Sequence, residues 1–239
     1  LKSIAGRKKV TLEMGGNAAV IVDESADLES AVKTIATGSF IYAGQVCIST
    51  QRIYVVESVF DRFVDMLQRA MSGITAGDPG VEGITVGPII DDMHLHRIRD
   101  WVDEAVANGA TVLCGGAVAD EEHHIYAPTL LTNTSSNMRV CRDEVFGPVA
   151  IVETVRDFAE GITRTNDSEF GLQAGVFTNT FTHVKAAHEQ LEVGGIMINN
   201  VPGFRVDSMP YGGIKSSGFG REGLKYAMEE MTEPRLLIY

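Results

Sequence analysis

Strand signals and helix signals alternate along nearly the whole chain. Short runs rich in β-branched and aromatic residues recur, and the segments between them carry apolar residues at helical spacing. Strands that alternate with helices are joined by right-handed crossovers, which produce a parallel sheet with helices on its faces. We therefore expect an α/β fold with a doubly wound, mostly parallel open sheet flanked by helices.

The expected elements can be placed along the chain. Residues 73–90 hold five glycines and two prolines and predict a long connection, while 200–218 predicts a glycine-rich loop. Strands are expected at 10–13, 18–23, 52–56, 111–113, 129–132, 148–154, 174–178 and 195–199, and helices at 27–42, 59–71, 92–108, 157–166, 182–191 and 221–231. In doubly wound sheets the active crevice lies outside the carboxyl ends of the strands, which suits Cys47, Glu144 and the 200–218 loop only if those loops share one edge.

Composition excludes several classes of function. The net charge of −12 argues against nucleic-acid binding. No apolar run approaches the roughly 20 residues that span a bilayer, and no secretory leader opens the chain, which begins with leucine and so starts at a cleavage point or a truncation. Three cysteines without metal-like spacing predict neither a disulfide framework nor a metal site, and a reducing cytoplasm is expected. The histidines form no ligand pattern and are interpreted as surface residues.

Cys47 is the candidate nucleophile. A thiol can become a strong nucleophile near neutral pH without a neighbouring base, because its thiolate is accessible. A free cysteine is also often a small inert core residue. Here Cys47 follows Gly44, which can end the helix 27–42, and it precedes the strand 52–56. It therefore lies on a turn, where a ligand can approach the backbone.

Four motifs together resemble the aldehyde dehydrogenase superfamily. They occur in this order and spacing, and the likeness covers the chain from its first residue to its last. The motifs are Glu13-Met14-Gly15-Gly16, Gly44-Gln45-Val46-Cys47, Glu144-Val145-Phe146-Gly147-Pro148 and Met209-Pro210-Tyr211-Gly212-Gly213-Ile214-Lys215-Ser216-Ser217-Gly218. Within that superfamily, lactaldehyde, semialdehyde and non-phosphorylating glyceraldehyde-phosphate dehydrogenases are the expected type. The chain looks like the second half of a family member, without the glycine-rich turn for the cofactor pyrophosphate, the lysine near the adenosine ribose and the asparagine of the oxyanion site.

The resemblance assigns a role to each candidate residue. Cys47 is the nucleophile that forms a thiohemiacetal and then a thioester, and Glu13 is the general base that activates water. Glu144 binds the nicotinamide ribose, and Phe146 and Met14 lie at the cofactor, which is NAD or NADP. From the residues alone, Glu13 could instead be a solvent-facing strand end, and Glu144 with Phe146 an ordinary loop and core filler.

The substrate residues implied are Tyr211, Phe204 and Arg205, in the loop that closes the substrate entrance of the family. Arg205 departs from the apolar residue common there, and a guanidinium suits a carboxylate or phosphate. It could equally form an ion pair with Asp207. As a hypothesis, the substrate is a small anionic or hydroxylated aldehyde.

The resemblance also implies the domain organisation. Residues 1–230 would form the catalytic domain and residues 231–239 a C-terminal oligomerisation strand, since an unprotected edge strand invites pairing with another chain. A homo-oligomer, a dimer or a tetramer, is expected.

Two alternatives remain open. One is a CoA-acylating semialdehyde dehydrogenase, against which Glu13 argues because a base favours water as the acyl acceptor. The other is that the isolated chain is a non-catalytic assembly module or a weak thiol esterase. We expect it to be inactive as a dehydrogenase on its own.

Overall fold

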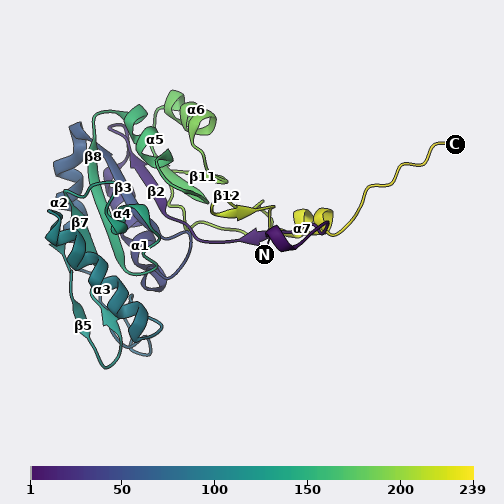
Figure 1. Cartoon of the computed structure of the whole chain (residues 1–239). Coiled ribbons are helices and arrows are strands. Elements are labelled where there is room, and N and C mark those ends of the chain that lie inside the picture. The colour runs from purple at the N-terminus through teal and green to yellow at the C-terminus, as the bar shows by residue number, and fades with distance from the viewer. Residues whose placement is uncertain (1) are drawn as a thin grey trace.

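A seven-stranded sheet forms the centre of the molecule in the computed structural model, which describes residues 2–239 (Figure 1). Its strand order is β11-β10-β2-β3-β8-β7-β4. All neighbours pair in parallel except β4 with β7, which are antiparallel. The strands are β2 (Ala18–Val22), β3 (Thr50–Val56), β4 (Thr111–Cys114), β7 (Thr129–Thr132), β8 (Val149–Val155), β10 (Gln173–Phe177) and β11 (Gly195–Ile198). The expected mostly parallel open sheet is therefore confirmed.

Helices cover both faces of this sheet. The helices α1 (Leu28–Phe40), α2 (Phe60–Met71) and α3 (Asp92–Ala107) pack on one face, in a core that includes Val20 and Val22 of β2. The helices α5 (Phe158–Asn166) and α6 (Phe181–Gln190) pack on the other face, against Ile21. Successive side chains of a strand point to opposite faces, so a strand buried on both sides reads as a continuous apolar run. The sheet is thus doubly wound, as predicted.

The order of the strands explains why helices occupy both faces. The chain runs from β2 to its neighbour β3, goes on to β4 at the far edge and fills the space between them with β7 and then β8. It then crosses back past β3 and β2 to add β10 and β11 on the other side. Helix α1 follows β2 and α5 follows β8, so the direction of winding reverses between them. Because crossovers are right-handed, connections that run in opposite directions across the sheet place their helices on opposite faces.

Short elements complete the fold, most of them outside the range of sequence prediction. They are η1 (Lys2–Ile4), η2 (Ile41–Gly44), η3 (Glu57–Val59), β1 (Leu12–Glu13), β5 (Val118–Asp120), β6 (Ile125–Tyr126), α4 (Arg139–Arg142), β9 (Phe170–Gly171), β12 (Ile214–Lys215), β13 (Gly218–Phe219) and α7 (Leu224–Glu230). Two of them, β12 and β13, lie in or next to the stretch expected to be only a loop. They pair with β9 and β1, respectively. These pairings could not be predicted, because both partners are distant in the sequence and no local pattern indicates them.

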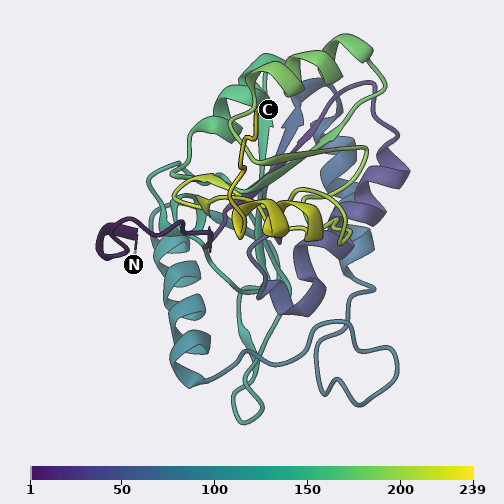
Figure 2. The same ribbon diagram turned by 90° about the vertical axis from the view of Figure 1, so that its right-hand side faces the viewer.

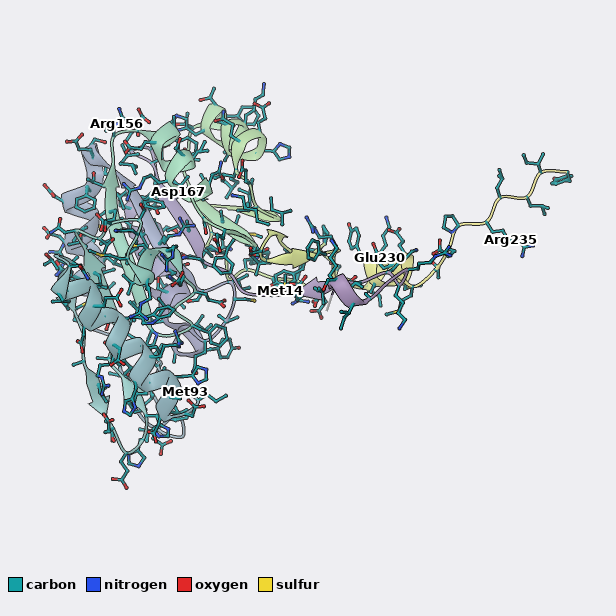
Figure 3. The ribbon with its side chains drawn as sticks, in the orientation of Figure 1. Met14, Met93, Arg156, Asp167, Glu230 and Arg235 are labelled. Atoms are coloured by element: carbon teal, nitrogen blue, oxygen red, sulfur yellow. The ribbon has the colours of Figure 1, made fainter. Side chains whose placement is uncertain are left out.

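The N-terminal segment and α7 project from the same side of the body (Figure 1), the side that faces the viewer in Figure 2. Lys9 forms an ion pair with Glu233, at 3.0 Å, and β1 pairs with β13. Figure 3 places Met14 where this arm leaves the body, Glu230 on α7 and Arg235 on the tail beyond it. Residues 231–239 form no strand within this chain, and Leu236, Leu237 and Ile238 are more than 80% exposed. Pairing of this tail with another subunit stays a prediction.

Candidate active site

The predicted residues lie at the amino ends of the central strands, and the carboxyl-end location that the general rule for doubly wound sheets offered does not apply to them. Glu13 precedes β2, Cys47 precedes β3 and Glu144 precedes β8, and these three strands are parallel neighbours. The carboxyl-end rule describes chains whose ligand loops follow the strands. Here the loops that lead into the strands carry the candidate residues, so the candidate site lies at the opposite edge.

The turn that carries Cys47 leaves α1 through a left-handed bend that ends at Gly44, where φ is +68°. A Cβ at Gly44 would overlap the carbonyl oxygen of Gly147, just before β8. Glycine alone lacks this atom and tolerates this backbone conformation. The turn therefore lies directly against the segment that contains Glu144.

Gly16 joins three parts of the site. Its N–H donates a 2.8 Å hydrogen bond to Oε1 of Glu144. On its other side, a Cβ at this position would overlap the carbonyl oxygen of Cys47. Because residue 16 has no side chain, the backbone after Glu13 can touch the nucleophile turn and the Glu144 carboxylate together.

Cys47 is half-buried, and its sulfur contacts the hydroxyl of Tyr211. The distance from Sγ to Oη is 3.2 Å, and either atom can donate the hydrogen bond. Tyr211 is 4% exposed and packs with Ile48 and Leu172. The structure thus brings the predicted nucleophile and the predicted substrate residue into direct contact.

Glu13 presents a carboxylate without a partner. Among residues 2–239, neither of its oxygens accepts a hydrogen bond, and both are buried. Its backbone is fixed because Glu13 pairs with Gly218. Burial raises the pKa of Glu13, and the charge of Glu222 adds to this, against the opposing charges of Arg205 and Arg221. A carboxylate of this kind suits a general base better than an ordinary surface glutamate does.

Glu144, Phe146 and Met14 are the predicted cofactor residues. Burial raises the pKa of Glu144, while the Gly16 N–H and the charge of Arg97 oppose the rise. Phe146 has a φ of +47° and is 38% exposed, and Met14 is 39% exposed. Glu144 thus offers a held carboxylate, and Phe146 and Met14 offer exposed apolar side chains.

Arg205 pairs with Glu222, not with Asp207 as one reading of the sequence proposed. The distance from Nη2 of Arg205 to Oε2 of Glu222 is 2.7 Å. The Arg205 guanidinium also lies 4.2 Å from the ring centre of Tyr211. Phe204, by contrast, faces a hollow of about 540 Å³ beside α1 and is absent from the cluster that holds Tyr211.

Three residues that the sequence analysis missed fix the geometry of these loops. Asn17 donates through Nδ2 to the carbonyl oxygens of Cys141 and Asp143, at 2.7 and 3.2 Å. Gln51 donates to the Asp143 carbonyl and accepts from the Val145 N–H, and the buried Arg52 donates to Asn17. The signal that could have indicated these residues is their position: Asn17, Gln51 and Arg52 are polar or charged and lie at the start of apolar strands. Polar groups that become buried there must find hydrogen-bond partners.

The opposite edge of the sheet holds a polar cluster around Asp23. This carboxylate is fully buried, and its Oδ2 accepts hydrogen bonds from Ser25, Thr178 and His183. His183 also stacks on Phe158, so the interpretation of all histidines as surface residues was wrong for this one. The partners of His183, which are Asp23 and Phe158, come from distant segments, so the sequence gives no local sign of these contacts.

Two classes of site are not found in the described part of the chain. No group of three or more histidine, cysteine, aspartate and glutamate side chains in residues 2–239 is arranged to hold a metal ion. No helix within those residues has the length and apolar character that crossing a membrane requires.

Comparison with known proteins identifies the family. The aldehyde dehydrogenase family model matches residues 1–237. A 3-sulfolactaldehyde dehydrogenase of Priestia aryabhattai is 45% identical over 238 residues, which is 100% of this chain and 49% of that protein. The chain thus spans about half the length of the curated relatives it matches.

Solved structures agree with this assignment. Aldehyde dehydrogenase 21 of Physcomitrella patens, in complex with the reaction product succinate, has a TM-score of 0.93 and 39% identity over 97% of this chain and 48% of its own. The glyceraldehyde-3-phosphate dehydrogenase GapN of Methanocaldococcus jannaschii, complexed with NADP, has a TM-score of 0.91 and 41% identity over 96% of this chain and 49% of its own. This chain belongs to the aldehyde dehydrogenase family. Its relatives are NAD(P)-dependent oxidoreductases.

Proposed function

We propose that this chain is the catalytic part of an NAD(P)-dependent aldehyde dehydrogenase that oxidises a small anionic or hydroxylated aldehyde to the carboxylic acid. The observation that carries the proposal is the junction at Gly16, three residues after Glu13, which links the backbone of Cys47 with the carboxylate of Glu144. A nucleophile, a base and a sugar-binding carboxylate are the parts that this reaction needs in one place.

Cys47 begins the reaction in this mechanism. Its thiolate attacks the carbonyl carbon of the aldehyde, and a thiohemiacetal forms. The Cys47 N–H has no backbone acceptor among residues 2–239, so it is available to the oxyanion. Loss of a hydride from the thiohemiacetal carbon then leaves a thioester on the sulfur of Cys47.

Glu144, Phe146 and Met14 would hold the nicotinamide end of NAD(P). Glu144 uses one oxygen to accept from Gly16, which leaves Oε2 for the vicinal hydroxyls of a ribose. Phe146 and Met14 offer exposed apolar surface to a planar ring. The residues therefore fit the cofactor, and bound NAD(P)⁺ supplies the hydride acceptor.

Glu13 acts in the second half of the reaction. Its unpartnered carboxylate takes a proton from water, and the resulting hydroxide attacks the thioester carbonyl and releases the acid. Burial raises the pKa of Glu13, which makes the carboxylate more basic. Water as the acyl acceptor distinguishes this mechanism from CoA acylation.

Arg205 would recognise the charge of the substrate. Its guanidinium lies over the ring of Tyr211, whose hydroxyl touches the Cys47 sulfur, so an anionic group on a short aldehyde would lie within its reach. The relatives named for sulfolactaldehyde or bound to succinate have anionic ligands. Glu222 now pairs with Arg205, and a substrate anion would exchange with it.

The assay of the whole mechanism is NAD(P)H formation by a full-length enzyme, in which this chain is joined to the nucleotide-binding half, with sulfolactaldehyde, succinate semialdehyde, lactaldehyde and uncharged propanal. Cys47→Ala should abolish turnover with each of them. Arg205→Leu should lower kcat/KM about 10- to 100-fold for the anionic aldehydes and leave propanal nearly unchanged, because one charge-assisted contact is lost. An unchanged preference for anionic aldehydes would overturn the role of Arg205.

Acyl transfer can be tested without a nucleotide. An activated ester such as p-nitrophenyl acetate should acylate Cys47 of the 239-residue chain, while we expect no NAD(P)H from that chain alone. Free acid as product supports hydrolysis, and acyl-CoA formed in the presence of CoA would support the CoA-acylating alternative. A chain that is never acylated would support the assembly module instead.

We further propose a homo-oligomer and a reducing, cytoplasmic setting. The exposed apolar tail at 236–239 has no partner strand within this chain, and edge strands pair readily with another copy. All three cysteines are free, and Cys47 must stay reduced to react. Light scattering of the chain with and without residues 231–239 tests the assembly, since removal of the tail should give the monomer.

A further inference from the structure

The hydroxyl of Tyr211 is the polar side-chain group that touches the sulfur of Cys47. The two atoms are 3.2 Å apart, and the tyrosine is 4% exposed. The ring packs with Ile48 and Leu172, and the Arg205 guanidinium covers it at 4.2 Å. The ring is thus packed on several sides, which places its hydroxyl oxygen against the sulfur.

The backbone of Tyr211 is fixed as well. Its N–H donates to the carbonyl oxygen of Glu222 at 3.1 Å, and the Glu222 N–H donates to the carbonyl oxygen of Tyr211 at 2.6 Å. Glu222 holds Arg205 through its side chain. The same residue therefore fixes both the backbone of Tyr211 and the cation above its ring.

Protonation decides the direction of the hydrogen bond. Burial raises the pKa of Tyr211, and the hydrogen bond and charge of Cys47 and the charge of Glu13 raise it further, against the opposing charge of Arg205. The phenol therefore keeps its proton through neutral pH. When the sulfur is a thiolate it has no proton to give, so the hydroxyl is the donor and the sulfur the acceptor.

We propose that Tyr211 is a positioning residue that donates a hydrogen bond to the Cys47 thiolate, stabilises it and orients it for attack on the carbonyl carbon. This inference rests on the proposed function in that it takes Cys47 as the nucleophile. A residue expected only to line the substrate entrance thereby acts on the reacting atom itself. A phenylalanine at position 211 would fill the same space without this bond.

The test is the pH profile of Cys47 alkylation by iodoacetamide, which reports the fraction of thiolate and needs neither aldehyde nor nucleotide. Mass spectrometry separates Cys47 from Cys114 and Cys141. In Tyr211→Phe the midpoint of the profile should move upward by about one pH unit, because a hydrogen bond to a charged group is lost. A midpoint that moves by less than about 0.3 unit would overturn the proposal.

Two further variants separate this effect from a change in folding. Tyr126→Phe makes the same chemical change at a tyrosine buried in the main core, and it should leave the profile unchanged. A fluorotyrosine at position 211, whose phenol is the stronger acid and the better donor, should move the midpoint downward. In denaturant the profiles of the wild type and Tyr211→Phe should coincide, and a difference that persisted there would contradict the structural origin.

The two proposals fail in different ways. A shifted profile, combined with a full-length enzyme that oxidises no aldehyde, would leave the hydrogen bond in place and overturn the proposed function. Aldehyde oxidation that depends on Cys47, combined with an unshifted profile in Tyr211→Phe, would do the reverse. With the function in place, we expect Tyr211→Phe to lower kcat at neutral pH about 10-fold and to recover part of this loss as the pH rises, which a purely structural defect would not do.

Discussion

Gly16→Ala is the substitution that most directly tests the junction of the site. The added Cβ would overlap the carbonyl oxygen of Cys47 and lie 3.2 Å from its carbonyl carbon. Both are backbone atoms, which cannot turn away as the end of a side chain can. The Cys47 turn and the segment after Glu13 must therefore move apart.

The size of the effect follows from that overlap. To reach a tolerable Cβ-to-oxygen distance, the two backbones must separate by about 1 Å, and packed interiors resist such shifts. Overpacking of this kind costs about 1–3 kcal/mol of stability. A displacement of about 1 Å at a nucleophile can lower its rate of reaction by about 10²-fold. The hydrogen bond from Gly16 to Glu144 would also lengthen.

The assay is the rate of Cys47 acylation by p-nitrophenyl acetate, together with urea denaturation. Gly73→Ala is the matched control, because its added Cβ would meet only the carbonyl oxygen of Ala70 at 3.5 Å, an ordinary contact. We expect the control to keep the wild-type rate and Gly16→Ala to lose most of it. Equal acylation rates in the two variants would refute the argument that the absence of a side chain at position 16 places Cys47.

The other predictions concern protonation and charge. Glu13→Gln should acylate normally but release the acyl group about 10²- to 10⁴-fold more slowly. Because burial raises the pKa of Glu13 above 4.5, the rate of wild-type deacylation should increase with pH through that raised value, and Glu13→Gln should lose this increase. Steady-state ester turnover from pH 4 to 9 measures both proteins. An increase that persisted in Glu13→Gln would exclude Glu13 as the base. For Asp23, burial alone would raise the pKa, but hydrogen bonds with Glu24, Thr178, His183 and Ser25 outweigh it and hold the pKa below its usual 3.8. The contribution of the Asp23 carboxylate to folding stability is therefore fully present above pH 3.8 and is lost as the pH falls through the lower pKa of the folded state. Asp23→Asn should lower the free energy of unfolding by about 3 kcal/mol at pH 7 and by less in acid, as urea titrations would measure. A loss of stability that did not change with pH would contradict this.

Much of the architecture could be predicted because it depends on local patterns. The apolar run of β2 and the periodicity of α1 are visible within a few residues, and they specify a strand buried on both faces and a helix beside it. Cys47 was correctly expected on the turn between α1 and β3. The strand β1 was expected within 10–13, but its pairing with β13 was not, and β12 and β13 themselves were not predicted, because each is only two residues long and pairs with a distant segment.

The sequence by itself determined the alternation of elements, the fold class and the motifs that indicate the family. Only the tertiary structure decided that the reactive groups gather at the amino edge of the sheet, that Arg205 pairs with Glu222 and that the Tyr211 hydroxyl reaches the Cys47 sulfur. The physical reason is range. Hydrophobic periodicity acts between neighbours along the chain, whereas these contacts join distant segments whose approach depends on the order of the strands and on the absence of side chains at Gly16 and Gly44.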